Sequence, residues 1–122
     1  MGKWVAPEVL DGALRAIAAA THMLAVPARP ADYAEAMAGR LAETVLGEAD
    51  FAIGPGNASG RRIAIAAKAA VPVAAAGAAN HVALIDRTAG RLLYVTTCPE
   101  QVLEPGGEVN FDGWSVEIGA PL

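Results

Sequence analysis

The residues that could carry chemistry are few and lie far apart in the 122-residue chain. Its two histidines, His22 and His81, are flanked by apolar residues, and neither has a second histidine three or four positions away to share a metal ion. Cys98 is the single cysteine, which excludes an intramolecular disulfide and a multi-cysteine zinc site. We expect two structural histidines, of which His81 could pair with Asp86, and a passive, partly buried thiol at Cys98.

Nucleophiles and phosphate-binding loops are also poorly supported. Ser59 and Ser115 are the only serines, and neither lies in the strand-turn-helix setting of an activated nucleophile. The glycine-rich residues 54–62 lack the lysine followed by Ser or Thr of a phosphate loop, and a strand rather than a helix is expected after them. We therefore predict a flexible surface loop there, no metal or other cofactor, and a protein that is not an enzyme.

Charge and hydropathy argue against two classes of partner. The chain has 9 Lys and Arg against 13 Asp and Glu, and its basic residues are scattered apart from Arg61 and Arg62. A polyanion binder concentrates positive charge, so no nucleic-acid partner is expected. The apolar residues 63–79 are interrupted by Lys68 and Pro72 and fall short of the about 20 apolar residues that span a bilayer, so no membrane partner is expected.

The elements that would position these residues begin with an amphipathic helix. Over residues 7–20, apolar side chains such as Leu10 and Leu14 recur with helical spacing, and a proline suits the first helical turn. Asp11 and Arg15 are expected on the other face. The helix should therefore lie against a sheet or a partner subunit.

Between this helix and Gly47 the pattern is less regular. Residues 22–26 predict a brief strand, which Pro27 and Pro30 end. Residues 32–45 are expected to form either a second, weaker helix or a loop, since alanine favours helix and glycine opposes it.

The chain after Gly47 has the pattern of β structure, with short apolar runs separated by turn residues. We predict one domain, with a helix and an extended arm in residues 1–46 and a β-sandwich in residues 47–122. The fold class is mainly β: an antiparallel sandwich of about six to eight short strands with one N-terminal α-helix. The expected strands are residues 51–53, 62–66, 71–75, 80–85, 91–97, 109–111 and 114–118.

Alternation within two of these strands predicts their buried faces. In residues 114–118 the apolar positions alternate with polar ones and should point inward. In the longer strand before them, Leu93 and Val95 should share one face, opposite Leu92 and Tyr94. Both faces of that strand are therefore expected to be partly covered.

Large side chains are scarce, because only 5% of the residues are aromatic, and those near the surface are candidates for binding. Trp4 precedes the first helix, where it could dock on a neighbouring subunit, since Trp is enriched at interface hot spots. Tyr33 is a second aromatic candidate, and Arg61 and Arg62 form the one local basic cluster. We name Trp4, Tyr33, Arg61 and Arg62 as the candidate interface residues.

A series of motifs runs in a fixed order through nearly the whole chain. They are residues 59–62 (SGRR), 66–68 (AAK), Gly77 with residues 81–86 (HVALID), residues 91–98 (RLLYVTTC), Gly107, Phe111 and residues 114–121 (WSVEIGAP). In this order the chain resembles a group of small structural proteins from tailed bacteriophages and phage-like particles.

The resemblance implies a structural protein of the virion, made in the bacterial host cytoplasm, and it carries over no catalytic residues. The favoured version is a capsid decoration, or cement, protein that binds the shell of the major capsid protein as a homo-oligomer. The alternative is a neck, tail or short-fibre component that contacts the host. A carbohydrate- or ligand-binding sandwich, with Trp4 and Tyr33 as an aromatic platform, is a more remote alternative.

Overall fold

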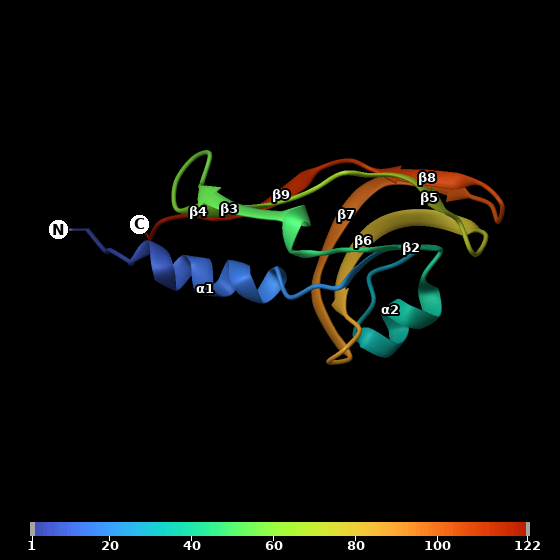
Figure 1. The fold of residues 1–122 in the computed structure, drawn as a ribbon, viewed down its shortest axis with the longest axis horizontal. Coiled ribbons are helices and arrows are strands. Elements are labelled where there is room, and N and C mark those ends of the chain that lie inside the picture. Colours follow the sequence, from blue (N-terminus) through green and yellow to red (C-terminus); the bar gives the residue numbers. More distant parts are fainter. Residues whose placement is uncertain (1, 122) are drawn as a thin grey trace.

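Antiparallel β-sheets are the main secondary structure of the molecule, which a computed structural model describes for residues 2–121 (Figure 1). Within these residues the chain forms nine strands, two α-helices and one turn of 3-10 helix. Their order is α1, β1, α2, β2, the 3-10 turn, and then β3 to β9 in succession. The expectation of a mainly β, antiparallel fold with an N-terminal helix is confirmed.

The first helix, α1 (Pro7–Ile17), begins with a proline, whose fixed backbone angle suits the first turn. Leu14 is fully buried, and Leu10 is half-buried one turn earlier. The helix lies along the sheet that contains β4 (Arg61–Ile65), and the two elements are in contact (Figure 1). The predicted amphipathic helix is therefore confirmed, although it ends at Ile17.

A second helix, α2 (Tyr33–Gly39), occupies part of the segment predicted as a weak helix or a loop. The Asp32 side chain accepts a hydrogen bond of 2.8 Å from the backbone N–H of Glu35, which caps the helix N-terminus. The same segment then enters a strand, β2 (Ala42–Val45), which the sequence pattern did not indicate. The predicted fold class, with a single α-helix, is therefore incomplete. The second helix has only seven residues, and its N-terminal cap and its packing on the sheet stabilise it.

A four-stranded antiparallel sheet, in the order β2-β1-β6-β7, forms the centre of the fold. Strand β1 (His22–Val26) pairs on one side with β2 and on the other with the long strand β6 (Gly77–Asp86). Strand β7 (Arg91–Leu103) returns beside β6 after a turn that ends at Gly90, whose φ is +66°. The predicted hairpin is confirmed.

The interior position of β1 corrects the proposed division of the chain at residue 46. Strands β1 and β2 supply half of the four-stranded sheet, so residues 1–46 are not an arm beside a separate sandwich. Strand β1 is short and almost wholly buried on both faces. Such a strand lacks the alternation of apolar and polar residues by which a sheet is recognised in a sequence.

Two smaller antiparallel sheets complete the β structure, one in the order β3-β4-β9 and one that pairs β5 with β8. In β9 the predicted alternation is confirmed, since three half-buried apolar residues alternate with two exposed polar ones. The remaining bounds are Glu48–Asp50 for the 3-10 turn, Phe51–Pro55 for β3, Lys68–Pro72 for β5, Glu108–Phe111 for β8 and Trp114–Ile118 for β9.

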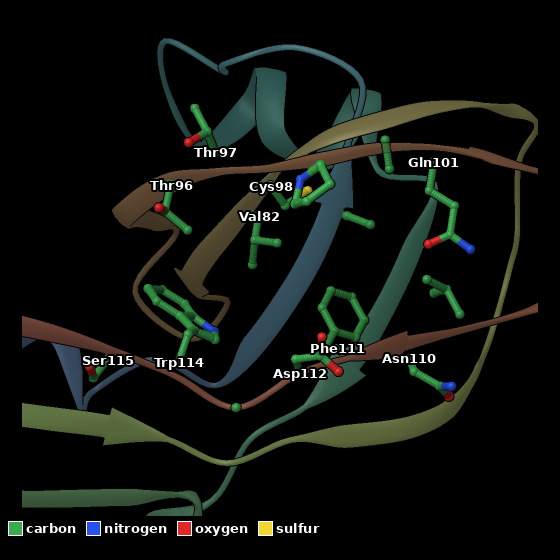
Figure 2. Close-up of a pocket in the computed structure, with 15 residues that line it drawn as sticks. Val82, Thr96, Thr97, Cys98, Gln101, Asn110, Phe111, Asp112, Trp114 and Ser115 are labelled. Atoms are coloured by element: carbon green, nitrogen blue, oxygen red, sulfur yellow. The ribbon is translucent and has the colours of Figure 1, made fainter.

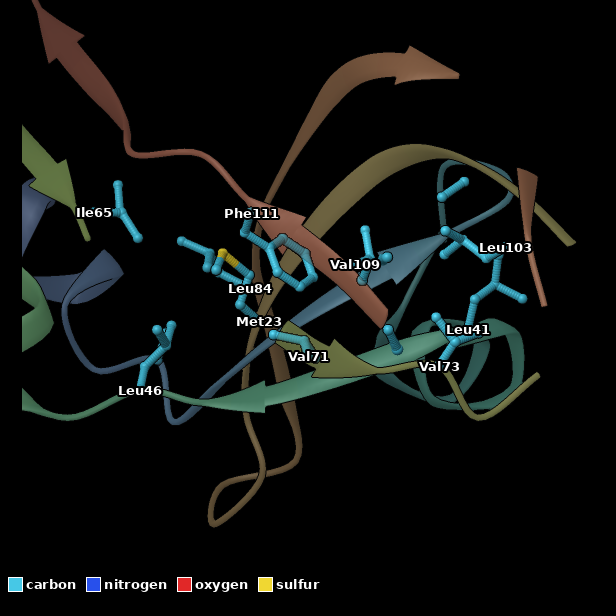
Figure 3. Close-up of a cluster of buried hydrophobic side chains, with 14 of the residues drawn as sticks. Met23, Leu41, Leu46, Ile65, Val71, Val73, Leu84, Leu103, Val109 and Phe111 are labelled. Atoms are coloured by element: carbon cyan, nitrogen blue, oxygen red, sulfur yellow. The ribbon is translucent and has the colours of Figure 1, made fainter. Parts of the chain in front are cut away.

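The larger hydrophobic cluster lies on the face of the four-stranded sheet that the β5–β8 pair covers, and it continues to α1 and β4 (Figure 3). Met23 of β1 and Leu84 of β6 stand opposite each other in the register and are fully buried. Val109 and Phe111 of β8 belong to the same cluster. Each side chain of this size contributes roughly 1.5–3 kcal/mol when it is fully buried, so the cluster is the main source of stability.

A smaller cluster fills the opposite face of the same sheet, beneath α2. It contains Leu24 and Val26 of β1, Ile85 of β6 and Ala36 of α2. Successive residues of a strand point to opposite faces, so Met23 and Leu24 belong to different clusters. Both faces of the central sheet are therefore covered by apolar groups.

A bulge in β7 changes which of its residues share a face. The register against β6 shifts between Tyr94 and Leu92, which leaves Leu93 as an extra residue. Leu93 and Tyr94 therefore both pack against the larger cluster, whereas Leu92 and Val95 pack against the smaller one. The predicted grouping of Leu93 with Val95 is wrong, because strict alternation assumes an unbroken ladder.

Candidate functional site

The segment before α1 and the segment after β9 lie at the same end of the molecule (Figure 1), and this end presents an exposed tryptophan. Trp4 lies in the extended segment before α1 and is 81% exposed, and Val9 of α1 is also exposed. The segment lies beside the C-terminal residues, since Trp4, Leu10, Gly60 and Pro121 line one cavity of about 180 Å³. Tryptophan is among the residue types most enriched where interfaces carry their binding energy, so the Trp4 segment is the candidate docking surface at this end.

Arg61 is held at this end by a bidentate ion pair. Its Nε donates to Oδ1 of Asp11 at 2.7 Å, and its Nη2 donates to Oδ2 at 3.2 Å. Asp11 is only 8% exposed, so the prediction that it lies on the face away from the sheet is wrong. The arginine on β4 compensates for burial of the charge. Arg61 therefore fastens α1 to β4 and gives the Trp4 segment a fixed base.

Three carboxyl groups have a pKa below the ordinary value, because their charged forms accept hydrogen bonds. The pKa of Asp11 lies below 3.8 chiefly because of the hydrogen bond from Arg61. The pKa of Asp50 is lowered first by the backbone N–H of Gly47 and then by a lysine. The pKa of Glu117 lies below 4.5 because it accepts backbone N–H groups of the β3–β4 loop. Acid should therefore weaken all three contacts.

Acidification is expected to lower the stability of the fold. Because each folded-state pKa lies below the unfolded-state value, the stabilisation is present above the ordinary values of 3.8 and 4.5 and is lost as the pH falls through the lowered ones. Thermal unfolding followed by circular dichroism should show a midpoint that is steady above about pH 5 and falls as the pH drops below the ordinary values of 3.8 and 4.5. Asp11→Asn should lower the midpoint at neutral pH and flatten the acid decline; an unchanged decline would contradict the role of Asp11.

The other two candidate interface residues, Arg62 and Tyr33, do not line the cavity beside Trp4. Arg62 stands opposite Glu117 in the β4–β9 register, and its Nε is buried with no hydrogen-bond partner among the described residues. Tyr33 begins α2 and packs against the smaller hydrophobic cluster. Of the four candidates, Trp4 and Arg61 border a common cavity. The structure therefore does not unite the four residues in one surface.

A larger cavity of about 480 Å³ opens between the four-stranded sheet and the chain from β8 to β9 (Figure 2). We call it the aromatic cavity. Val82 and Cys98 line it from β6 and β7, and Phe111 and Trp114 line it from the other side. Ligand pockets commonly enclose roughly 300–1,000 Å³, so a cavity of this size can hold one large side chain or a small molecule.

The lining of the aromatic cavity suits binding better than catalysis. Its one charged lining residue is Asp112, which is exposed at the rim. The Trp114 ring lies 5.9 Å from that of Tyr94, and its Nε1 is covered without an acceptor among residues 2–121. Burial raises the pKa of the Cys98 thiol, which keeps the thiol neutral and weakly nucleophilic. The cavity can therefore hold an apolar or aromatic group.

The glycine-rich loop between β3 and β4 binds a carboxylate of the protein itself. The backbone N–H groups of Asn57 and Ala58 donate to Glu117 at 2.5 and 3.1 Å. The Ser59 hydroxyl accepts a hydrogen bond of 3.0 Å from the backbone N–H of Ala120. The donors that could have cradled a phosphate are therefore already satisfied, and the loop predicted to be flexible is fastened to β9 and the segment after it.

The two histidines have separate local partners. His22 Nδ1 lies 2.8 Å from Thr21 Oγ1, and His81 Nδ1 lies 2.6 Å from Asn80 Oδ1. The suggested pairing of His81 with Asp86 is wrong, because the Asp86 carboxylate accepts backbone N–H groups of its own turn. In residues 2–121, no three His, Cys, Asp or Glu side chains gather closely enough to hold a metal ion. The helices of this part of the chain are too short to cross a membrane.

The aromatic cavity was missed from the sequence because its lining comes from five strands and the link before β9. The alternation in β9 signalled that Trp114 faces inward, but no motif indicated that Phe111 and Cys98 border the same space. The exposed position of Trp4, by contrast, follows from its place before the first helix. Comparison of the chain with protein-family models, with curated proteins and with solved structures found no match.

Proposed function

We propose that this protein is a structural protein of the virion of a tailed bacteriophage or phage-like particle, and that it decorates the capsid shell. Two features support the proposal: the order of motifs along the chain, which resembles such proteins, and the exposed Trp4 at one end of the molecule. Assembly requires complementary surfaces, and Trp is among the residue types most enriched where interfaces carry their binding energy.

The exposure of Trp4 is the observation that carries the assembly function. Burying a tryptophan removes roughly 150–250 Å² from water, a gross gain of about 4–6 kcal/mol at 25 cal/mol per Å². The isolated chain leaves most of this gain unused, because the side chain is 81% exposed. The Asp11–Arg61 pair fixes the helix that follows Trp4, so less conformational entropy is lost on docking.

The location of the chain in purified particles tests the proposal. Mass spectrometry should detect the chain in the particle, and cryo-electron microscopy should place its density on the capsid shell. Particles that lack the chain would contradict the virion function altogether. Density at the neck or tail would support the alternative of a neck, tail or short-fibre component and would contradict the decoration role.

The structure offers little support for the carbohydrate-binding alternative. That alternative uses Trp4 and Tyr33 as one aromatic platform. Trp4 lies before α1, near both termini, whereas Tyr33 begins α2 near the opposite end of the molecule (Figure 1). Because two aromatic rings on distant elements do not form one platform, we favour the assembly function.

A further inference from the structure

The chain has both an exposed tryptophan and an aromatic cavity that is large enough to take an indole ring. Trp4 is 81% exposed, and the cavity beside Phe111 and Trp114 encloses about 480 Å³ (Figure 2). An indole ring is flat and apolar, and aromatic rings pack favourably against one another in offset or edge-to-face arrangements. The two features are therefore complementary in chemistry and in size.

Trp4 does not fill the aromatic cavity of its own molecule. It lies in the segment before α1 and lines the small cavity beside Gly60 and Pro121. None of the residues that line this small cavity also lines the aromatic cavity. The aromatic cavity is therefore available to a tryptophan of another molecule.

The charges beside the two features are opposite in sign. Lys3 precedes Trp4 and is exposed, and Asp112 is the one charged residue that lines the aromatic cavity. An exposed pair of this kind contributes little affinity but favours one orientation of docking. The attraction should bring the Trp4 segment toward the rim of the cavity.

We propose that Trp4 of one copy docks in the aromatic cavity of a second copy. The inference rests on the assembly function proposed above and names the partner of Trp4 as another molecule of the same chain. Donor and acceptor are different surfaces of each molecule, so two copies can dock reciprocally in a two-fold dimer or one after another in a head-to-tail contact. A head-to-tail contact closes into a ring when the rotation between neighbours permits, and otherwise extends as a filament.

The first test compares assembly of the wild type with that of two variants. Size-exclusion chromatography with light scattering should show an assembled species whose population rises with concentration. Trp4→Ala should raise the concentration needed for assembly by about thirtyfold, the effect of losing a hot-spot residue. Val9→Ala removes another exposed apolar side chain near the same end and should leave assembly unchanged. An assembly curve for Trp4→Ala that matches the wild type would overturn the proposal, as would a wild type that stays monomeric at every concentration.

Cys98 provides a second test, because the single cysteine lies in the aromatic cavity. Its reaction rate with a thiol reagent should fall as the wild-type concentration rises, since docking covers the thiol. In Trp4→Ala the rate should not depend on protein concentration. Equal behaviour of the two proteins would show that Trp4 docks elsewhere and would overturn the proposal.

A mixing experiment tests whether Trp4 of one copy and the aromatic cavity of another copy form the contact. Wild type whose Cys98 carries a bulky maleimide adduct retains only the donor, and Trp4→Ala retains only the acceptor. Each should be monomeric alone, and the mixture should form dimers and nothing larger. Cys98→Ser treated with the same reagent should assemble normally, which controls for side reactions. The absence of mixed dimers would contradict the inference, while the virion location would still be decided by the particle experiment.

Discussion

Replacing Gly60 by alanine is expected to destabilise the protein by about 2–5 kcal/mol, through backbone strain and overpacking together. Gly60 has a φ of +66°, in the left-handed region that side chains disfavour. A Cβ at this position would overlap the carbonyl oxygen of Ile118 and lie 2.9 Å from the carbonyl carbon of Gly119. These backbone atoms lie in and just after β9, so relief of the overlap would open the β4–β9 edge. Urea unfolding followed by circular dichroism measures the loss.

Gly90 provides a matched control for this substitution. It has the same φ of +66°, but a Cβ there would meet no atom within 4 Å. Gly90→Ala should therefore cost only the backbone strain, about 1–2 kcal/mol. Equal losses at Gly60 and Gly90 would contradict the argument, because the close approach of β9 would then have no energetic effect.

Leu84→Ala is expected to destabilise the fold by about 3–5 kcal/mol. Leu84 is fully buried in the larger hydrophobic cluster and stands opposite Met23 in the centre of the four-stranded sheet. The substitution removes buried apolar volume and leaves a cavity that the surrounding strands cannot close, because both of its neighbouring strands are fixed by ladder hydrogen bonds. The midpoint of urea unfolding should fall while the slope of the transition is unchanged.

Val102→Ala is the control for Leu84→Ala. Val102 lies on β7 and is 71% exposed, so its truncation should change the free energy of unfolding by less than about 0.5 kcal/mol. Similar losses for the two variants would show that the larger cluster is not the main source of stability.

Local patterns were sufficient to predict the first helix, the hairpin and the alternation in the last strand. Each is specified by residues close in the sequence: helical spacing from Leu10 to Leu14, a glycine late in the turn at Gly90, and alternate burial from Trp114 onward. These local patterns predict the observed elements correctly because tertiary packing favours the same conformation as the local sequence does.

Features that depend on distant residues were not predictable in this way. Asp11 of α1 can be buried because Arg61, which lies on β4 and 50 residues further along the chain, supplies its counter-charge. Leu93 changes face because a bulge in the ladder with β6 inserts one residue. The aromatic cavity forms where two separate parts of the chain meet. In each case tertiary contacts override the local pattern.

The interior position of β1 also has a consequence for how the protein is made. On the ribosome, β1 emerges early, but the strand that completes its second edge is β6, formed by Gly77–Asp86. Strand β4 similarly gains its second neighbour only when β9, the last strand among residues 2–121, has been made. Non-local pairings of this kind close slowly, and unpaired apolar edges are prone to aggregate before closure. Synthesis therefore passes through a stage in which β1 and β4 each lack a neighbour and depend on the late residues for protection.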